Sequence, residues 1–277
     1  MQVAAPAKIN LNLRVLGKNE ATGYHGIESW MVPLTLADEL RVELTATPGI
    51  RLTCSDPELD AGSDNLAWRA AELFLRATNH VGGASIELHK RIPHGAGLGG
   101  GSSDAAAVLK ALADQSGHPL DATALETLGA KLGSDVPFFI RGQAAIARGR
   151  GEIIEPRPLD APLDLLLLKP PFPVPTAWAY QAYAGKQFCP PSWTAPQLHE
   201  GLEIFNDLER AVFAKYVLLP AMKQWLLEHS LVAAASMTGS GSCLFAILRD
   251  PRGTDQLATE AKAVFGETLW TKSCRTA

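Results

Sequence analysis

A glycine- and serine-rich segment, HGAGLGGGSSD at residues 94–104, restricts the local structure of this chain more than any other stretch. It follows an alternating run, residues 86–89, that is typical of a β-strand, and it leads into a helical pattern of apolar residues. Glycine permits positive φ and lets a ligand approach the main chain closely. Main-chain N–H groups at the start of a helix attract anions. The segment therefore predicts a phosphate-binding loop between a strand and a helix.

Three familiar phosphate-binding patterns do not fit this chain. A P-loop needs a lysine followed by serine or threonine after its last glycine, whereas Gly101 is followed directly by Ser102. Gly95, Gly97 and Gly100 satisfy a bare G-x-G-x-x-G pattern, but the chain lacks the repeated βαβ units of a dinucleotide-binding fold. The His-Arg-Asp and Asp-Phe-Gly partners of protein kinases are also missing. A merely flexible loop is disfavoured, because the segment runs straight into a well-patterned helix.

Hydrophobic periodicity predicts an α+β fold with helices packed on mainly antiparallel sheets. Strands are expected at residues 9–14, 40–44, 86–89, 138–140, 144–147, 163–168, 232–237 and 243–248. Helices are expected at residues 66–74, 105–112, 122–132, 177–184, 208–213, 221–228 and 258–265. Ser102 or Ser103 is expected to cap the helix after the glycine loop. Prolines cluster at residues 156–162, which predicts a boundary between a domain of residues 1–155 and one of residues 156–277.

The composition is that of an ordinary globular protein with ample material for a core: 47% of the 277 residues are apolar and 19% are charged. The net charge of −4, without a long basic run, disfavours a nucleic-acid partner. No apolar run reaches the roughly 18 residues that span a bilayer, and the first residues do not resemble a signal peptide. The four cysteines lack Cys-x-x-Cys spacing, which favours free thiols in the cytoplasm. The oligomeric state is left open.

Four further short segments accompany the glycine loop. They are PAKINL at residues 6–11, GYH at 23–25, LGSDVP at 132–137 and TGSGSC at 238–243. Together with Pro93–Ala105, they resemble, in order and spacing, the motifs of the GHMP kinases, the family of the galactokinase, homoserine, mevalonate and phosphomevalonate kinases. The resemblance extends from residue 6 to about residue 245. It implies a two-domain GHMP-kinase fold, in which an N-terminal domain like ribosomal protein S5 domain 2 precedes a C-terminal ferredoxin-like domain.

The resemblance implies transfer of the γ-phosphoryl group of ATP to a hydroxyl of a small cytidyl diphosphate substrate. Lys8 and Asp135 are the expected catalytic residues. A carboxylate takes the hydroxyl proton as the new bond forms, and a lysine stabilises the developing negative charge. Without the motifs, Asp135 would be read as a turn aspartate and Lys8 as a solvated strand lysine. Mg²⁺ is expected only with the nucleotide, bridging its phosphates, so no metal site made by protein alone is expected.

The resemblance also implies two sets of binding residues. Those expected to bind ATP are Asn65, Lys90, Pro93, Gly95, Gly97, Leu98, Gly99, Gly100, Gly101, Ser102 and Ser103. Those expected to bind the substrate are Asn10, Tyr24, His25, Thr176 and Tyr180. Tyr24 would stack on the cytosine ring and His25 would read its polar edge.

Two positions depart from the family pattern. Relatives have an aromatic residue where Met31 stands here, next to Trp30, so the outer wall of the cytosine pocket stays undefined. Asp104 replaces a commoner asparagine and is expected to cap the helix, with contact to Mg²⁺ through water as the alternative.

Three rival functions are weighed against this one. Another kinase of the same family would act on a different alcohol, but Gly23-Tyr24-His25 and the triple glycine argue against it. A non-catalytic nucleotide-sensing protein would not need both Lys8 and Asp135. A dinucleotide oxidoreductase has only the bare glycine pattern in its favour.

Overall fold

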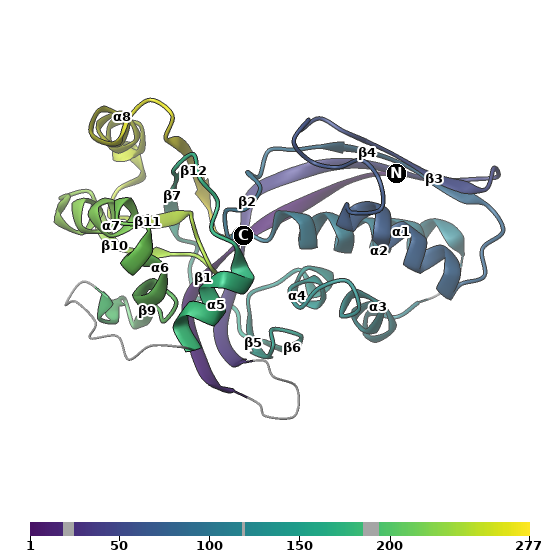
Figure 1. Cartoon of the computed structure of the whole chain (residues 1–277), viewed down its shortest axis with the longest axis horizontal. Helices are drawn as coiled ribbons and strands as arrows, with labels where there is room; N and C mark the ends of the chain where they lie inside the picture. Colours follow the sequence, from purple (N-terminus) through teal and green to yellow (C-terminus); the bar gives the residue numbers. More distant parts are fainter. Residues whose placement is uncertain (19–24, 118–119, 185–193) are drawn as a thin grey trace.

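The computed structural model describes residues 1–18, 25–117, 120–184 and 194–277, which form two β-sheets with helices packed against them (Figure 1). In this part of the chain, the first sheet has eight strands: six in the order β3-β4-β2-β1-β9-β8, with β5 paired to β2 and β6 to β5. Their bounds are β1 Gln2–Lys18, β2 His25–Thr45, β3 Gly49–Cys54, β4 Gly83–His89, β5 Ala145–Gly149, β6 Ile153–Pro156, β8 Gln197–His199 and β9 Leu202–Asn206. Most of the pairings are antiparallel, as predicted; β3–β4 and β1–β9 are parallel.

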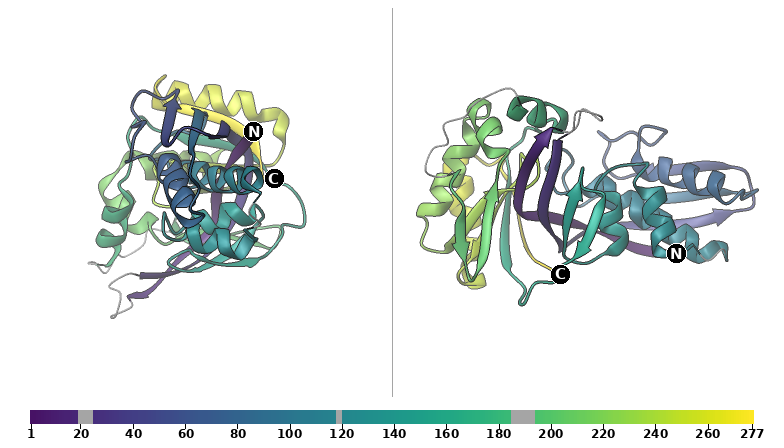
Figure 2. Two further views of the ribbon diagram at one scale, coloured as in Figure 1. Left: turned by 90° about the vertical axis from the view of Figure 1, so that its right-hand side faces the viewer. Right: turned by 90° about the horizontal axis from the view of Figure 1, so that it is seen from below.

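The long antiparallel β1–β2 pair connects the two halves of the molecule. At one end of the pair, the last residues of β2 bond to β4. At the other end, β2 bonds to β5 and β1 bonds to β9. Figures 1 and 2 show these two strands running from the helical lobe to the second half of the chain. Residues at the middle of β1 therefore lie where both halves meet.

Four helices cover one face of the first sheet: α1 (Leu66–Ala77), α2 (Gly100–Ser116), α3 (Ala122–Gly129) and α4 (Val136–Arg141) (Figure 1). Val108 and Leu112 of α2 are fully buried in the core cluster that these helices form with β2 and β4, together with Phe74 of α1. Their helical spacing in the sequence is the reason that they share this face.

The second sheet is antiparallel, with the strand order β10-β11-β7-β12. Its strands are β7 (Asp164–Lys169), β10 (Val232–Met237), β11 (Leu244–Leu248) and β12 (Trp270–Arg275). Strand alternation divides the four leucines of β7: Leu165 and Leu167 face the first sheet, and Leu166 and Leu168 face the helices. These helices are α5 (Thr176–Ala184), α6 (Glu209–Lys215), α7 (Leu218–Glu228) and α8 (Thr254–Phe265), the last preceded by the 3₁₀ turn η2 (Pro251–Gly253).

The strand predicted at residues 138–140 is wrong, because this segment is the short helix α4. Pro137 stands in the first turn, where a helix tolerates its missing N–H, and Gly142 ends the helix with φ 69°. Residues 138–140 are all buried and all apolar. Their sequence therefore shows neither the helical nor the alternating period that would distinguish a helix from a strand. The helix predicted at residues 122–132 also ends earlier, at Gly129.

None of the helices in the described ranges combines the length and the apolar character needed to cross a lipid bilayer.

Candidate active site

A cavity of about 960 Å³ opens where the glycine loop, the β1–β2 pair and the second half of the chain meet. Its wall contains most of the residues that the sequence analysis selected. They are Lys8, Asn10, His25, Asn65, Lys90, Pro93, Gly95, Gly97, Leu98, Gly99, Gly100, Gly101, Ser102, Asp135, Thr176 and Tyr180. Tyr24 lies outside the described residues, and Ser103 lies beneath the wall. Residues from six separate segments of the sequence thus share one cavity.

The glycine loop is held in a conformation that only glycine adopts easily. Gly95, Gly97 and Gly99 have φ values of 62°, 75° and 75°. A Cβ atom on Gly97 would lie 2.2 Å from the carbonyl oxygen of Thr238, so the loop contacts the turn between β10 and β11 directly. Two main-chain bonds fix it further: Lys8 N–H donates to Leu98 O at 2.9 Å, and Cys243 N–H donates to Ala96 O at 3.1 Å. The loop is therefore a rigid cradle.

Helix α2 begins at Gly100, directly after the left-handed Gly99, and no side chain caps it. The predicted cap by Ser102 or Ser103 is wrong, because both lie inside the first turn. Ser103 N–H donates to Gly99 O at 2.9 Å, and the earlier N–H groups of this turn are left for a ligand, where the helix dipole adds positive potential. Ser102 reaches the cavity wall, whereas Ser103, one position further around the helix, is 1% exposed and its Oγ has no partner.

Lys8 and Asp135 come together at the mouth of this loop. The Lys8 ammonium donates to Asn10 Oδ1 at 2.7 Å and to Gly97 O at 2.8 Å, and it lies 3.9 Å from Asp135 Oδ2. Burial lowers the pKa of Lys8, and the charge of Asp135 raises it in part. Asp135 stands at the N-terminus of α4, where its side chain is 33% exposed. The pair thus joins an enclosed cation to a carboxylate that a substrate can reach.

The side-chain amide of Asn10 forms hydrogen bonds to other side chains of the protein. Its Nδ2 donates to Ser29 Oγ at 2.7 Å, and its Oδ1 accepts both Lys8 and the Thr238 hydroxyl. It borders the cavity, but its amide holds Lys8 in place.

Lys90 and Asp104 form a buried ion-pair cluster with Asp38. The Lys90 ammonium donates to Asp104 Oδ2 at 2.7 Å and also to Asp38, whose other oxygen accepts the N–H groups of Arg91 and Ile92. The predicted helix cap by Asp104 is wrong, because α2 starts four residues earlier and Asp104 pairs with Lys90 instead. Burial outweighs the charge of Lys90 and raises the pKa of Asp104 to about 7.

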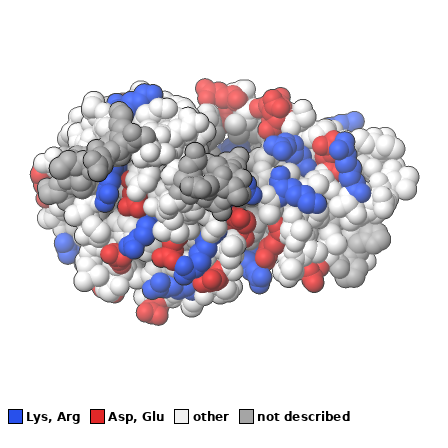
Figure 3. All heavy atoms as spheres, turned by 60° about the horizontal axis from the view of Figure 1, so that its bottom comes forward, with Lys and Arg blue, Asp and Glu red and all other residues white. Residues whose placement is uncertain are grey.

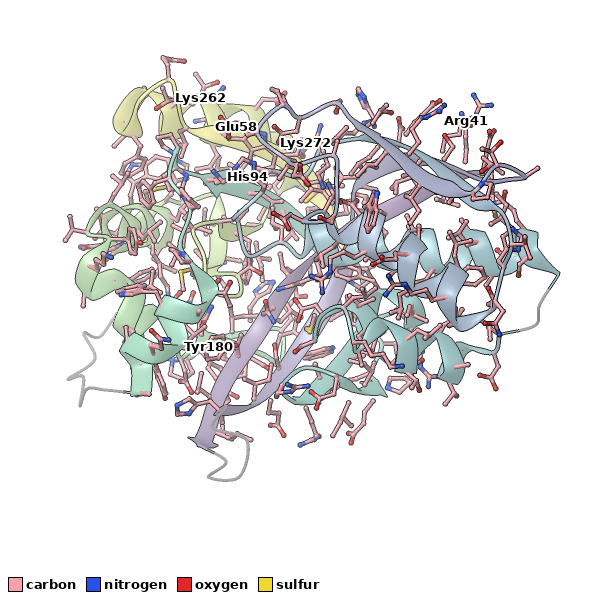
Figure 4. The ribbon with its side chains drawn as sticks, turned by 45° about the vertical axis from the view of Figure 1, so that its right-hand side comes forward. Arg41, Glu58, His94, Tyr180, Lys262 and Lys272 are labelled. Carbon is pink, nitrogen blue, oxygen red and sulfur yellow. The ribbon has the colours of Figure 1, made fainter. Side chains whose placement is uncertain are left out.

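Asn65 caps α1 while it faces the cavity. Its Oδ1 accepts the N–H of Ala67 at 2.9 Å, and its Nδ2 donates to Asp60 O at 2.8 Å. At the same end of the cavity, His94 lies between Asp56 and Glu58, 3.3 Å and 3.4 Å away (Figure 4).

His25, Thr176 and Tyr180 line the opposite part of the cavity. His25 Nδ1 lies 3.1 Å from the carbonyl oxygen of Leu16. A carbonyl oxygen only accepts, so Nδ1 carries a hydrogen; in the neutral imidazole Nε2, which is buried without a partner, is then an acceptor. Tyr180 comes from α5 (Figure 4); its burial, and then the charge of Asp135, raise the pKa of its hydroxyl.

Sequence reasoning missed several residues of the cavity wall. Arg150, in the turn between β5 and β6, and the turn Gly239–Gly241 both belong to it. No local pattern marks Arg150, since only the pairing of β5 with β2 carries it there. Met31 faces the cavity, whereas Trp30 points to the other side and donates to Arg157 O at 3.0 Å. Trp30 therefore does not replace the missing aromatic wall.

Comparison with known proteins places this site in a family. The GHMP kinases N terminal domain matches residues 65–143, and the GHMP kinases C terminal domain matches residues 194–267. The chain is 42% identical over 271 residues to a 4-diphosphocytidyl-2-C-methyl-D-erythritol kinase of Methylacidiphilum infernorum, covering 96% of this chain and 93% of that protein. It is 37% identical to the enzyme of the same name from Geobacter sp. strain M21, covering 96% of each. The chain belongs to the GHMP kinase family.

Solved structures agree with this GHMP kinase assignment. The crystal structure of a 4-(cytidine 5'-diphospho)-2C-methyl-D-erythritol kinase matches with a TM-score of 0.80 and 36% identity over the whole of both chains. A homoserine kinase from Cytophaga hutchinsonii matches with a TM-score of 0.66 at 17% identity, which shows the fold alone. The predicted α+β GHMP-kinase fold is confirmed, and the chain is an ATP-dependent kinase of this family rather than a dinucleotide oxidoreductase.

Proposed function

We propose that this chain transfers the γ-phosphoryl group of ATP to the 2-hydroxyl of 4-diphosphocytidyl-2-C-methyl-D-erythritol, in the non-mevalonate route to isoprenoid precursors. The observation that carries the proposal is the placement of Lys8 and Asp135, 3.9 Å apart, at the mouth of the glycine loop. Relatives that share 35–42% of their residues with most of this chain carry this enzyme name.

Different residues of the cavity have different roles in the proposed reaction. The substrate oxygen attacks the γ-phosphorus, the bond to the β–γ bridging oxygen breaks, and ADP leaves. Asp135 takes the hydroxyl proton, because its carboxylate is open to the cavity. The Lys8 ammonium stabilises charge near the acceptor oxygen, and the free N–H groups at the start of α2 bind the triphosphate.

His25 supports a cytosine base in the substrate. Its Nε2 is an acceptor on the cavity wall, and the exocyclic amino group of cytosine is a donor. Uracil has a carbonyl oxygen in place of this amino group and would leave His25 Nε2 without a hydrogen-bond donor. Tyr24 remains the expected stacking partner. Arg150 adds a cation that favours the diphosphate of the substrate.

Mg²⁺ would act with the nucleotide, where it neutralises charge on the phosphates. Within the described residues, no group of three histidine, cysteine or carboxylate side chains could hold a metal ion. The ion would depend on the phosphates, with oxygen ligands from Ser102 and from Asp104, whose Oδ1 is buried on the cavity wall without a protein partner. Hard oxygen donors of this kind suit Mg²⁺.

We further propose a domain boundary near Pro156, which is supported by family matches that end at residue 143 and resume at residue 194. A cytoplasmic location is supported by the unpaired thiols of Cys54, Cys243 and Cys274. On the face drawn in Figure 3, basic and acidic side chains are interspersed, which does not favour a nucleic-acid partner.

A coupled assay of ADP release tests the proposal. We expect turnover with the cytidyl substrate and none with homoserine or phosphomevalonate. Turnover with one of those alcohols instead would point to another GHMP kinase. Binding of ATP without ADP release with any of the three would favour a nucleotide-sensing protein.

The His25→Ala variant tests the base assignment. Leaving the cytosine amino group unpaired should raise the KM for the cytidyl substrate roughly 10- to 100-fold, since an unmade buried hydrogen bond costs about 1–3 kcal/mol. The KM for ATP should stay unchanged. An equal loss in both constants would contradict the role of His25, and a uridine analogue of the substrate should lose its disadvantage in this variant.

A further inference from the structure

Thr238, which follows β10, contacts both acceptors of the Lys8 ammonium. Its hydroxyl lies 3.2 Å from Asn10 Oδ1 and 3.3 Å from Gly97 O, the same two oxygens that Lys8 binds. It also accepts the N–H of Asn10 at 3.1 Å. Thr238 is fully buried and is not part of the cavity wall. One hydroxyl therefore joins β1, the glycine loop and the β10–β11 turn at the point where Lys8 is held.

This arrangement matters because a lysine side chain has no fixed position of its own. Its four carbons rotate freely, so the acceptors at its end decide where the charge lies. The two acceptors belong to different segments, Asn10 on β1 and Gly97 in the loop. The single hydrogen of the Thr238 hydroxyl lies within reach of both oxygens, and the hydroxyl thereby keeps the two acceptors at a constant separation.

Thr238 is itself fixed by the second half of the chain. Glu209 Oε1 accepts the N–H of Met237 at 2.8 Å, and Asn206 Nδ2 donates to the carbonyl oxygens of Met237 and Gly239 at 2.6 Å and 2.8 Å. Glu209 is in turn paired with Lys223 at 2.6 Å, and both side chains are buried. A buried polar network whose members are all bonded is rigid. The position of Lys8 is thus set from the C-terminal half.

We infer that Thr238 is a positioning residue for Lys8. The inference rests on the proposed function, because transfer to a hydroxyl requires the ammonium to stay between the glycine loop and Asp135. Loss of the Thr238 hydroxyl should leave the ATP and substrate contacts in place and slow the chemical step.

A double-mutant cycle tests this coupling. Thr238→Val should lower kcat about 10- to 100-fold, the cost of a slightly misplaced group, and leave both KM values within about twofold. In a Lys8→Met background, the same change should lower kcat no more than about twofold, because Thr238 acts through Lys8. Thr238→Ser should restore kcat. Equal losses in both backgrounds would overturn the inference.

Thr276→Val is the matched control. The Thr276 side chain is also buried, and its hydroxyl accepts the N–H of Leu163 at 2.8 Å, outside the cavity wall. It should lower the melting temperature without lowering kcat. If it lowers kcat as much as Thr238→Val does, the effect is a general one of lost stability and the inference fails.

A second measurement needs no turnover. Acetic anhydride labelling of Lys8, followed by peptide mass spectrometry with the exposed Lys110 as reference, reports how firmly the ammonium is held. Labelling should be several-fold faster in Thr238→Val and unchanged in Thr238→Ser and Thr276→Val. An unchanged rate in Thr238→Val would overturn the inference. The labelling rates test the role of Thr238 even if the wild-type protein fails to phosphorylate the cytidyl substrate. That failure would contradict only the proposed function.

Discussion

The Lys8 ammonium and the Asp135 carboxylate lie 3.9 Å apart, yet the Lys8 side chain is 4% exposed and that of Asp135 is 33% exposed. The cation is fixed inside the wall by two acceptors, while the carboxylate borders the cavity. This asymmetry assigns different tasks to the two groups. Lys8 supplies a stationary charge, and Asp135 contacts the acceptor hydroxyl.

Asp135→Asn should lower kcat by at least about 100-fold, because the amide cannot take the hydroxyl proton. ATP affinity should change little, since the start of α2 and not Asp135 binds the triphosphate. Steady-state assays give kcat, and calorimetric titration gives ATP affinity. Near-normal turnover would remove Asp135 from the proposed role.

The fall of kcat at alkaline pH, the alkaline limb of its pH profile, should reflect deprotonation of the Lys8 ammonium. Burial lowers its pKa below the usual 10.5. Lys8 therefore loses its proton, and kcat falls, as the pH rises through this lowered pKa. The Asp135 charge raises the pKa of Lys8 in part, so the residual activity of Asp135→Asn should fall at a lower pH than that of the wild type. Lys8→Arg, which keeps its charge, should lack this limb. Limbs at the same pH in the wild type and Asp135→Asn would contradict the coupling.

Gly97→Ala should disrupt the glycine loop. Its φ of 75° costs an alanine about 1–2 kcal/mol, and the new Cβ would also meet the carbonyl oxygen of Thr238 at 2.2 Å. Because of this contact, we expect Gly97→Ala to lower the free energy of unfolding by more than the about 1–2 kcal/mol that the positive φ alone would cost. We also expect weaker ATP binding. Gly117→Ala is the control, because its φ of 66° is similar but the space around it is open. Urea denaturation and ATP titration should separate the two variants; similar behaviour would argue that the loop is not pinned against the turn.

Lys223→Met should lower the free energy of unfolding by about 3–5 kcal/mol, because it leaves the buried Glu209 carboxylate without its cation. Burial raises the pKa of Glu209, and Lys223 opposes that rise. In the variant, the deficit should therefore shrink as the pH falls and the carboxyl takes a proton. Glu209→Gln combined with Lys223→Met keeps an oxygen for the N–H of Met237 and should regain most of the stability. Equal deficits in the single and double variants, measured in urea, would refute this account.

Features that depend on a few neighbouring residues were predictable from the sequence. The glycine loop between a strand and a helix follows from the local need for positive φ, and helices such as α1 and α7 follow from their apolar spacing. The family motifs also brought Lys8 and Asp135 into one site, although 127 positions separate them. The cavity and the 3.9 Å contact agree with that expectation.

Features that depend on distant partners were not predictable. The first five residues of α4 are all buried and only Arg141 at its end is exposed, so their sequence has no period that separates a helix from a strand. Asp104 was expected to be a helix cap and Lys90 to be an ATP-binding residue; nothing near them in the sequence indicated that Asp38, on another strand, joins them in one buried cluster. Likewise, nothing near Thr238 in the sequence indicates that it shares two acceptors with Lys8. Local conformation follows from the residues beside it, whereas the partner of a buried charge or hydroxyl is chosen only when separate strands and loops pack together.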